Sequence, residues 1–158
     1  MATKKKQINS AVEQTGIKIR RAKSSDAAQI AELSGQLGYP ATLAEIAQRL
    51  RNIKPSSHHA VLVAESPERK VIGWLHVSVS ALLETQLRAE VNGLVVSGEV
   101  RSRGTGALLL SAAERWARKQ GCKSMSVRSN VIRDRAHQFY LRHGYEHYKT
   151  QKAFRKSI

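Results

Sequence analysis

Residues 89–121 constrain the fold most strongly, because they join a strand, a glycine-rich loop and a helix without interruption. Residues 89–96 are rich in apolar and β-branched side chains, as in a strand. Glycines follow at positions 98, 104 and 106, and from Ala107 apolar residues recur at helical spacing until Gly121, a residue that commonly ends a helix. A strand that passes through a glycine loop into a helix is typical of α/β domains.

The rest of the chain continues this mixture. Strands are expected over residues 17–20, 60–64, 71–79, 89–96, 122–127 and 145–154, and helices before Gly38, after the capping Thr42, from Ala107 and over 133–143. The first four strands predict an antiparallel sheet, and the later strand-helix-strand unit predicts a crossover. A length of 158 residues fits one domain, over 17–158, and the polar residues 1–16 are expected to form a flexible basic tail.

The charge is high and uneven. Lys and Arg number 27 against 12 Asp and Glu, which gives a formal net charge of +15. Residues 101–158 hold 14 basic and 3 acidic side chains, a net +11, so we expect an anion to bind the last third of the chain.

Several classes of protein are disfavoured. No apolar run reaches the roughly 20 residues of a membrane-spanning helix, and no signal peptide is recognisable, so we expect a cytoplasmic protein without membrane contact. Cys122 is the only cysteine, which excludes an intramolecular disulfide. Neighbours on a strand point to opposite faces, so His58 and His59 do not chelate one ion together, and no metal is expected.

The loop before the helix has the chemistry of a phosphate site. A helix begins with unpaired N–H groups and a partial positive charge, and glycines let a phosphate approach them. Gly104 and Gly106 lie at this point, with Arg101 and Arg103 beside them. A plain strand-to-helix turn is the alternative. A P-loop is disfavoured because Gly106 is not followed by Lys and Ser or Thr, and a dinucleotide fingerprint is disfavoured because Leu109 stands where a small residue is needed.

With these residues the sequence resembles the GNAT superfamily of N-acetyltransferases. Residues 101–106, Arg-Ser-Arg-Gly-Thr-Gly, match the family's Arg/Gln-x-x-Gly-x-Gly/Ala loop. Residues 136–145 are similar to its Ala-x-x-Phe-Tyr-x-x-x-Gly-Phe/Tyr segment. The resemblance implies a single α/β domain with a mixed, largely antiparallel central sheet flanked by helices on both faces, and acetyl-CoA as co-substrate.

The resemblance also implies which residues hold the coenzyme. The residues matched to its diphosphate are Arg101, Ser102, Arg103, Gly104, Thr105, Gly106 and Ala107, and those matched to the pantetheine arm and the thioester carbonyl are Leu94, Val95 and Val96, through their main chain. One position departs from the family, because Arg133 stands where an asparagine is frequent. Asn130 is the candidate that replaces its contact with the pantetheine arm.

Acetyl transfer to an amine requires a base. A primary amine of pKa about 10.4 is neutral in only about one molecule in 2,500 at pH 7. Glu90 is the candidate base, directly or through water, and an exposed glutamate without a role is the alternative. By alternation Asn92 lies on the same strand face and can orient the amine or a water. Tyr140 occupies the family's tyrosine position and is expected to donate a hydrogen bond to the leaving thiolate.

The acceptor is less well constrained than the donor. Tyr39 lies in the segment where the family places acceptor-binding elements, and the stretch is similar to members that act on aminoglycosides or aminoalkylphosphonates. We expect a small primary amine of aminoglycoside, aminoalkylphosphonate or polyamine type. A protein lysine or an amino-terminal amine is the alternative. A CoA sensor without catalysis and a nucleic-acid-binding domain are disfavoured, the latter because no recognition motif accompanies the charge. The sequence neither predicts nor excludes a homodimer.

Overall fold

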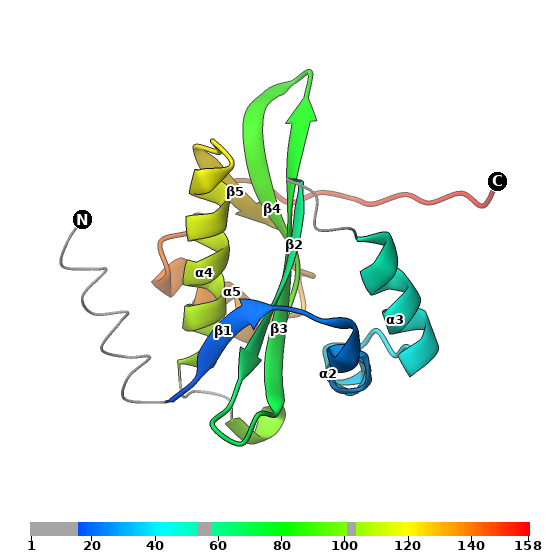
Figure 1. The fold of residues 1–158 in the computed structure, drawn as a ribbon. Coiled ribbons are helices and arrows are strands. Elements are labelled where there is room, and N and C mark those ends of the chain that lie inside the picture. The colour runs from blue at the N-terminus through cyan, green and yellow to red at the C-terminus, as the bar shows by residue number, and fades with distance from the viewer. Residues whose placement is uncertain (1–15, 54–57, 101–103) are drawn as a thin grey trace. The chain divides into compact units, whose positions relative to one another are not determined.

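The computed structural model describes residues 16–53, 58–100 and 104–158 (Figure 1). It contains two compact units, Met1–Arg128 and Ser129–Ile158. The first holds the sheet and most of the helices, and the second holds one helix and the carboxyl-terminal segment. The expected basic tail lies almost wholly in residues 1–15, outside the described residues.

The first unit is built on a five-stranded sheet whose strands follow one another in chain order. The strands are β1 (Lys18–Arg21), β2 (His59–Glu65), β3 (Val71–Leu82), β4 (Thr85–Val96) and β5 (Ser124–Val127). The pairs β1–β2, β2–β3 and β3–β4 are antiparallel, whereas β4 and β5 are parallel. Parallel neighbours need a crossover connection, and a helix supplies it here, as the sequence predicts.

Helices cover both faces of this sheet (Figure 1). The short 3₁₀ helix η1 (Ser24–Asp26), α2 (Ala27–Leu37) and α3 (Leu43–Asn52) lie on one face, and α4 (Thr105–Lys119) lies on the other. Buried residues of α2 and α3 form one apolar cluster with strand residues, which includes Ile30, Leu33, Ile46, Val63 and Val95. On the opposite face Leu109 of α4 is fully buried beside Gly73 of β3. The expected fold class is confirmed.

The local signals for the ends of α2 and α3 are confirmed. Gly38 ends α2 in the left-handed conformation, with φ of 91°. Thr42 caps α3: its hydroxyl accepts from the Glu45 N–H at 3.2 Å, and the Glu45 carboxylate accepts from the Thr42 N–H at 2.7 Å. None of the described helices is long and apolar enough to cross a membrane.

Two expectations about strands are wrong. Residues 85–88, expected as a connection, belong to β4, so β3 and β4 form one long hairpin. The expected strand over residues 145–154 is absent from the structure. The second unit instead has α5 (Asp134–Arg142) followed by an exposed segment in which Tyr148 is 67% and Phe154 90% exposed. Most side chains there are polar or charged, so pairing this segment would bury little apolar area to offset the entropy of ordering it.

Replacing each of two glycines of the first unit with alanine is expected to change the free energy of unfolding in opposite directions. A Cβ at Gly73 would lie 2.9 Å from the Val95 carbonyl oxygen, whereas one at Gly35, in α2, meets nothing within 4 Å. We expect Gly73→Ala to lower the free energy of unfolding by about 1–3 kcal/mol through overpacking. Gly35→Ala should raise it by up to about 1 kcal/mol, because alanine favours the helix. Urea unfolding measures both, and a Gly73→Ala variant at least as stable as Gly35→Ala would contradict the packing described here.

Candidate active site

The strands β4 and β5 separate before β4 ends. Their parallel ladder runs from Arg88 opposite Ser124 to Val91 opposite Val127, whereas β4 continues to Val96. Beyond Val91, no described strand pairs with β4 on the β5 side. The residues expected to hold the pantetheine arm, Leu94, Val95 and Val96, lie in this continuation. The sheet therefore offers main chain there instead of a continued ladder.

A β-bulge at Asn92 accompanies the separation. In the pairing with β3, Val91 lies opposite Val77 and Gly93 lies opposite His76, so Asn92 is the extra residue of β4. The bulge corrects the expected alternation. Since paired residues share a face, Glu90 lies on the face of Gly93 and Val95, which α2 and α3 cover, whereas Leu94 and Val96 lie on the α4 face.

Glu90 has the surroundings of a held carboxylate. Its side chain is 14% exposed, and its Oε1 lies 2.5 Å from the Arg128 Nε, just after β5. The register places Ser78 on one side of it and Ser126 on the other. Arg128 was not foreseen from the sequence, although a residue two positions beyond Ser126 on a parallel neighbour is a geometric candidate.

Asn92 and two histidines extend this polar surface. The Asn92 Nδ2 donates to the Ser78 Oγ at 2.8 Å. The His59 Nδ1 and the His76 Nε2 lie 3.1 Å apart. Burial, with His59 as a second cause, lowers the pKa of His76 to about 4, so His76 is neutral at pH 7. The sequence alone suggested a pair of His58 and His59, whereas the register of β2 and β3 brings His76 close to His59.

The start of α4 has open space where a phosphate is expected. Gly104 precedes the helix with φ of 83°, and a Cβ there would meet nothing within 4 Å. Thr105 is 1% exposed, and its hydroxyl oxygen has no hydrogen-bond partner among the described residues. The N–H groups of residues 105–107 open the helix, where the ladder of α4 supplies no acceptor. These features fit a diphosphate. Arg101, Ser102 and Arg103 lie outside the described residues.

The second unit holds the remaining expected residues, described by themselves. Asn130 organises the turn before α5: its side-chain oxygen accepts from the Ile132 N–H at 3.2 Å. Tyr140 makes edge contacts with Phe139 and Tyr145, at centroid distances of 5.3 and 5.6 Å. Burial raises the pKa of Tyr140 to about 12, although Arg133 acts in the opposite direction.

Tyr39, the expected acceptor contact, is 68% exposed just after α2 ends. Near this end of α2, Leu37 lies 3.9 Å from the position of a Cβ on Gly93. The ring of Trp74 lies closer, at 2.8 Å, and its indole N–H is buried without a described partner. The carboxyl end of α2 thus adjoins the bulge in β4, and Trp74 is a further residue there that was not predicted from the sequence.

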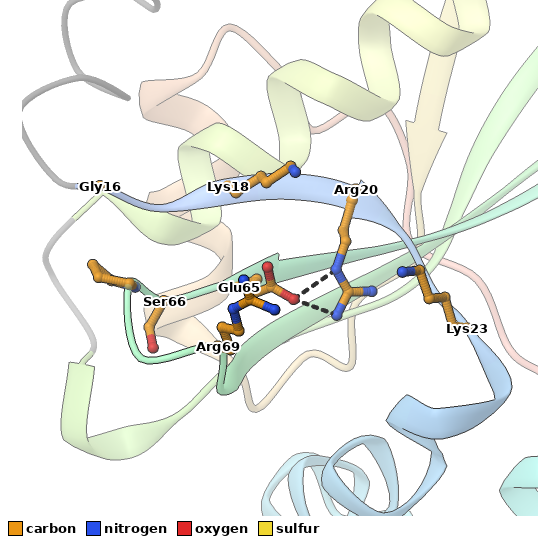
Figure 2. Close-up of a pocket in the computed structure, with 8 residues that line it drawn as sticks. Gly16, Lys18, Arg20, Lys23, Glu65, Ser66 and Arg69 are labelled. Carbon is orange, nitrogen blue, oxygen red and sulfur yellow. Dashed lines mark hydrogen bonds and ion pairs between the residues drawn. The ribbon is translucent and has the colours of Figure 1, made fainter.

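A hollow of about 420 Å³ lies at the other edge of the sheet, beside β1 (Figure 2). It is basic, with Lys18, Lys23 and Arg69 around it. The guanidinium of Arg20, at its centre, donates hydrogen bonds to two carboxylates. Its Nε lies 2.8 Å from Glu65 Oε2, and its Nη1 lies 2.8 Å from Asp26 Oδ2. β2 and β3 separate β1 from β4, so this hollow is not part of the surface around Glu90.

In the part of the chain that the structure describes, other reactive groups do not form a second centre. No group of three or more His, Cys, Asp or Glu that could hold a metal occurs among the described residues. Cys122 is buried, and burial raises the pKa of its thiol, which suits packing and not nucleophilic attack.

Comparisons with known proteins show what this chain is similar to. The aminoalkylphosphonate N-acetyltransferase of Salmonella typhimurium is 30% identical over 77% of this chain and 77% of that protein. An aminoglycoside N(6')-acetyltransferase of Klebsiella aerogenes is 28% identical over 72% of this chain and 76% of that protein. The solved structure of an aminoglycoside 6'-N-acetyltransferase from Acinetobacter baumannii shares the fold, with a TM-score of 0.78 at 21% identity over 90% of this chain and 99% of that one. A solved structure of an aminoglycoside N-acetyltransferase in complex with CoA has a TM-score of 0.79 at 19% identity, over 90% of this chain and 95% of that one.

The family model described as acetyltransferase (GNAT) family matches residues 27–145. This match spans most of the chain, including the strand of Glu90, the start of α4 and the segment of Tyr140. The chain therefore belongs to the GNAT acetyltransferase family and is an acetyl-CoA dependent N-acetyltransferase.

Proposed function

We propose that this enzyme acetylates a small primary amine, with Glu90 as the base. The observation that carries the proposal is one strand, β4, which presents a half-buried, ion-paired carboxylate just before it bulges and separates from β5. Two relatives whose names specify small amines, an aminoalkylphosphonate and an aminoglycoside, support the substrate class. A protein lysine or amino-terminal amine is the alternative acceptor.

The coenzyme side of the proposal uses the main chain. The N–H groups that open α4 would bind the diphosphate, with Gly104 leaving room for it. Main-chain groups of residues 94–96 would hold the pantetheine arm and donate to the thioester oxygen, which gains negative charge as the amine attacks. Bound there, acetyl-CoA supplies the acetyl group and a thiolate leaving group.

The amine side uses the polar surface around Glu90. The carboxylate would take the proton that the attacking nitrogen loses, directly or through one water. Its ion pair with Arg128 fixes the position of the Glu90 carboxylate at the end of the β4–β5 ladder. Asn92, already bonded to Ser78, is placed to orient the amine or that water.

Tyr140 would stabilise the leaving thiolate by donating a hydrogen bond. With the Tyr140 pKa at about 12 and a thiol pKa near 8.5, full proton transfer to sulfur is uphill by roughly 5 kcal/mol. The phenol therefore keeps its proton and donates it only in a hydrogen bond. Asn130 would contact the pantetheine arm, and Tyr39 the acceptor.

We also propose that residues 17–158 act as one acetyltransferase domain. The family model runs from residue 27 to residue 145, across the boundary at Arg128 that divides the two compact units. Residues that the proposal needs occur in both units.

Glu90→Gln tests the base. We expect kcat with a good amine to fall by about a hundredfold or more, because the amide does not accept the proton. The affinity for acetyl-CoA should stay unchanged, since the coenzyme contacts lie elsewhere. Glu32→Gln, at an exposed position of α2, is the control. Steady-state kinetics measure both, and a Glu90→Gln enzyme within about threefold of wild type would overturn the role of Glu90.

Gly104→Asp tests the coenzyme site. A carboxylate at the start of α4 would repel the diphosphate, so the Kd for CoA should rise by about tenfold or more. Gly104→Asn is the matched control, because asparagine has the same shape and bears a similar cost at φ of 83° without the charge. Calorimetry gives both values. Equal affinities of the Asp and Asn variants would show that no phosphate binds at this point.

A further inference from the structure

The surface around Glu90 carries more positive than negative charge, and this bears on the acceptor. Glu90 is the only acidic residue in β3, β4 and β5, all of whose residues the structure describes. Arg88 lies on the same face of β4, because side chains two positions apart in a strand share a face. Arg128 is bound to the Glu90 carboxylate from the β5 side.

Both guanidiniums have capacity for an anion. The side chain of Arg128 is 80% exposed, and its recorded ion pair engages Nε, one of the nitrogens of the guanidinium fork. The Nε of Arg88 is buried and has no hydrogen-bond partner among the described residues. A buried donor of a charged group without a partner is costly, so it calls for an acceptor that the described residues do not provide there.

We propose that the acceptor is a short amine that also carries an oxyanion, a phosphonate, phosphate or carboxylate, and that Arg88 and Arg128 bind that oxyanion. This inference rests on the proposed function. A zwitterionic acceptor would replace the ion pair between Glu90 and Arg128 with two new ion pairs. Its ammonium would pair with Glu90, and its oxyanion would pair with Arg128.

The spacing suits a small molecule. Glu90 and Arg88 are two residues apart in an extended strand, so their Cα atoms are separated by about 7 Å. An amine and an oxyanion joined by two or three carbons fit between such side chains.

A polycation lacks this complementarity. An aminoglycoside or polyamine brings several ammonium groups, of which Glu90 neutralises one. The others face Arg88 and Arg128, and like charges at short range disfavour binding. The same chemistry therefore selects an anionic amine over the polycationic acceptors of the wider proposal.

The test compares acceptors of matched size on the full chain with acetyl-CoA. The probes are 2-aminoethylphosphonate, β-alanine and n-propylamine, which carries no oxyanion, with spermidine and an aminoglycoside as polycations. We expect kcat/KM for at least one of the two anionic amines to exceed that for n-propylamine and both polycations by about tenfold or more, as charge-assisted hydrogen bonds do. The two anionic probes distinguish phosphonate from carboxylate.

Arg128→Met and Arg88→Met then assign the residues. Each should lower the ratio of kcat/KM for the better anionic amine to that for n-propylamine by about tenfold. Arg115→Met, on α4 where Arg115 donates to Ser111, should leave the ratio unchanged. Thermal stabilisation by CoA in all three variants verifies that they are folded.

The outcomes separate the two proposals. If no amine is acetylated, the proposed function fails. If amines are acetylated but n-propylamine or a polycation matches the anionic probes, the proposed function stands and the anionic acceptor is wrong. Unchanged ratios in both arginine variants would also overturn the assignment of Arg88 and Arg128.

Discussion

One extra residue in β4 lies at the level where the sheet stops pairing on the β5 side. Asn92 is paired with no residue of β3, and the ladder between β4 and β5 ends at the same level. An unpaired strand edge in a sheet must satisfy its N–H and C=O groups elsewhere, so the end of the β4–β5 ladder leaves β4 main chain that a ligand can bind. The bulge also changes which side chains share a face: Glu90 lies with the acceptor side, whereas Leu94 and Val96 lie toward α4. The proposed base and the proposed coenzyme contacts thus come from one strand, on opposite faces of the sheet.

The sequence was informative where the signals are local. The caps at Thr42 and Gly38, the period of α4 and the glycine at its start depend on residues close in the chain, and the structure agrees with each. Contacts between residues far apart in the chain could not be predicted from the sequence. The bulge at Asn92 depends on the register of β3, and the contacts of Glu90 with Arg128 and of His59 with His76 join residues far apart in sequence. Residues 145–154 show a weak alternation of the kind found in strands, but the segment buries too little apolar surface to form one.

The charge of +15 now divides into parts with different roles. Around Arg20 two carboxylates already satisfy the guanidinium, and this bonding, acting against burial, lowers the pKa of Asp26. At Glu90 the balance is reversed, since two arginines accompany one carboxylate. A local excess of positive charge beside a single carboxylate is a property of this surface, whereas the net charge of the chain bears mainly on solubility and encounter.

Amide hydrogen exchange with and without CoA tests the central claim most directly, namely that the strand continuation after Asn92 and the start of α4 form the coenzyme site. The N–H groups of residues 105–107 have no acceptor in the helix ladder, so they should exchange fast in the free enzyme and slowly with CoA. Protection should also rise in residues 94–96. Unchanged exchange at both segments, with protection instead in the hollow beside β1 around Lys18 and Lys23, would contradict the account.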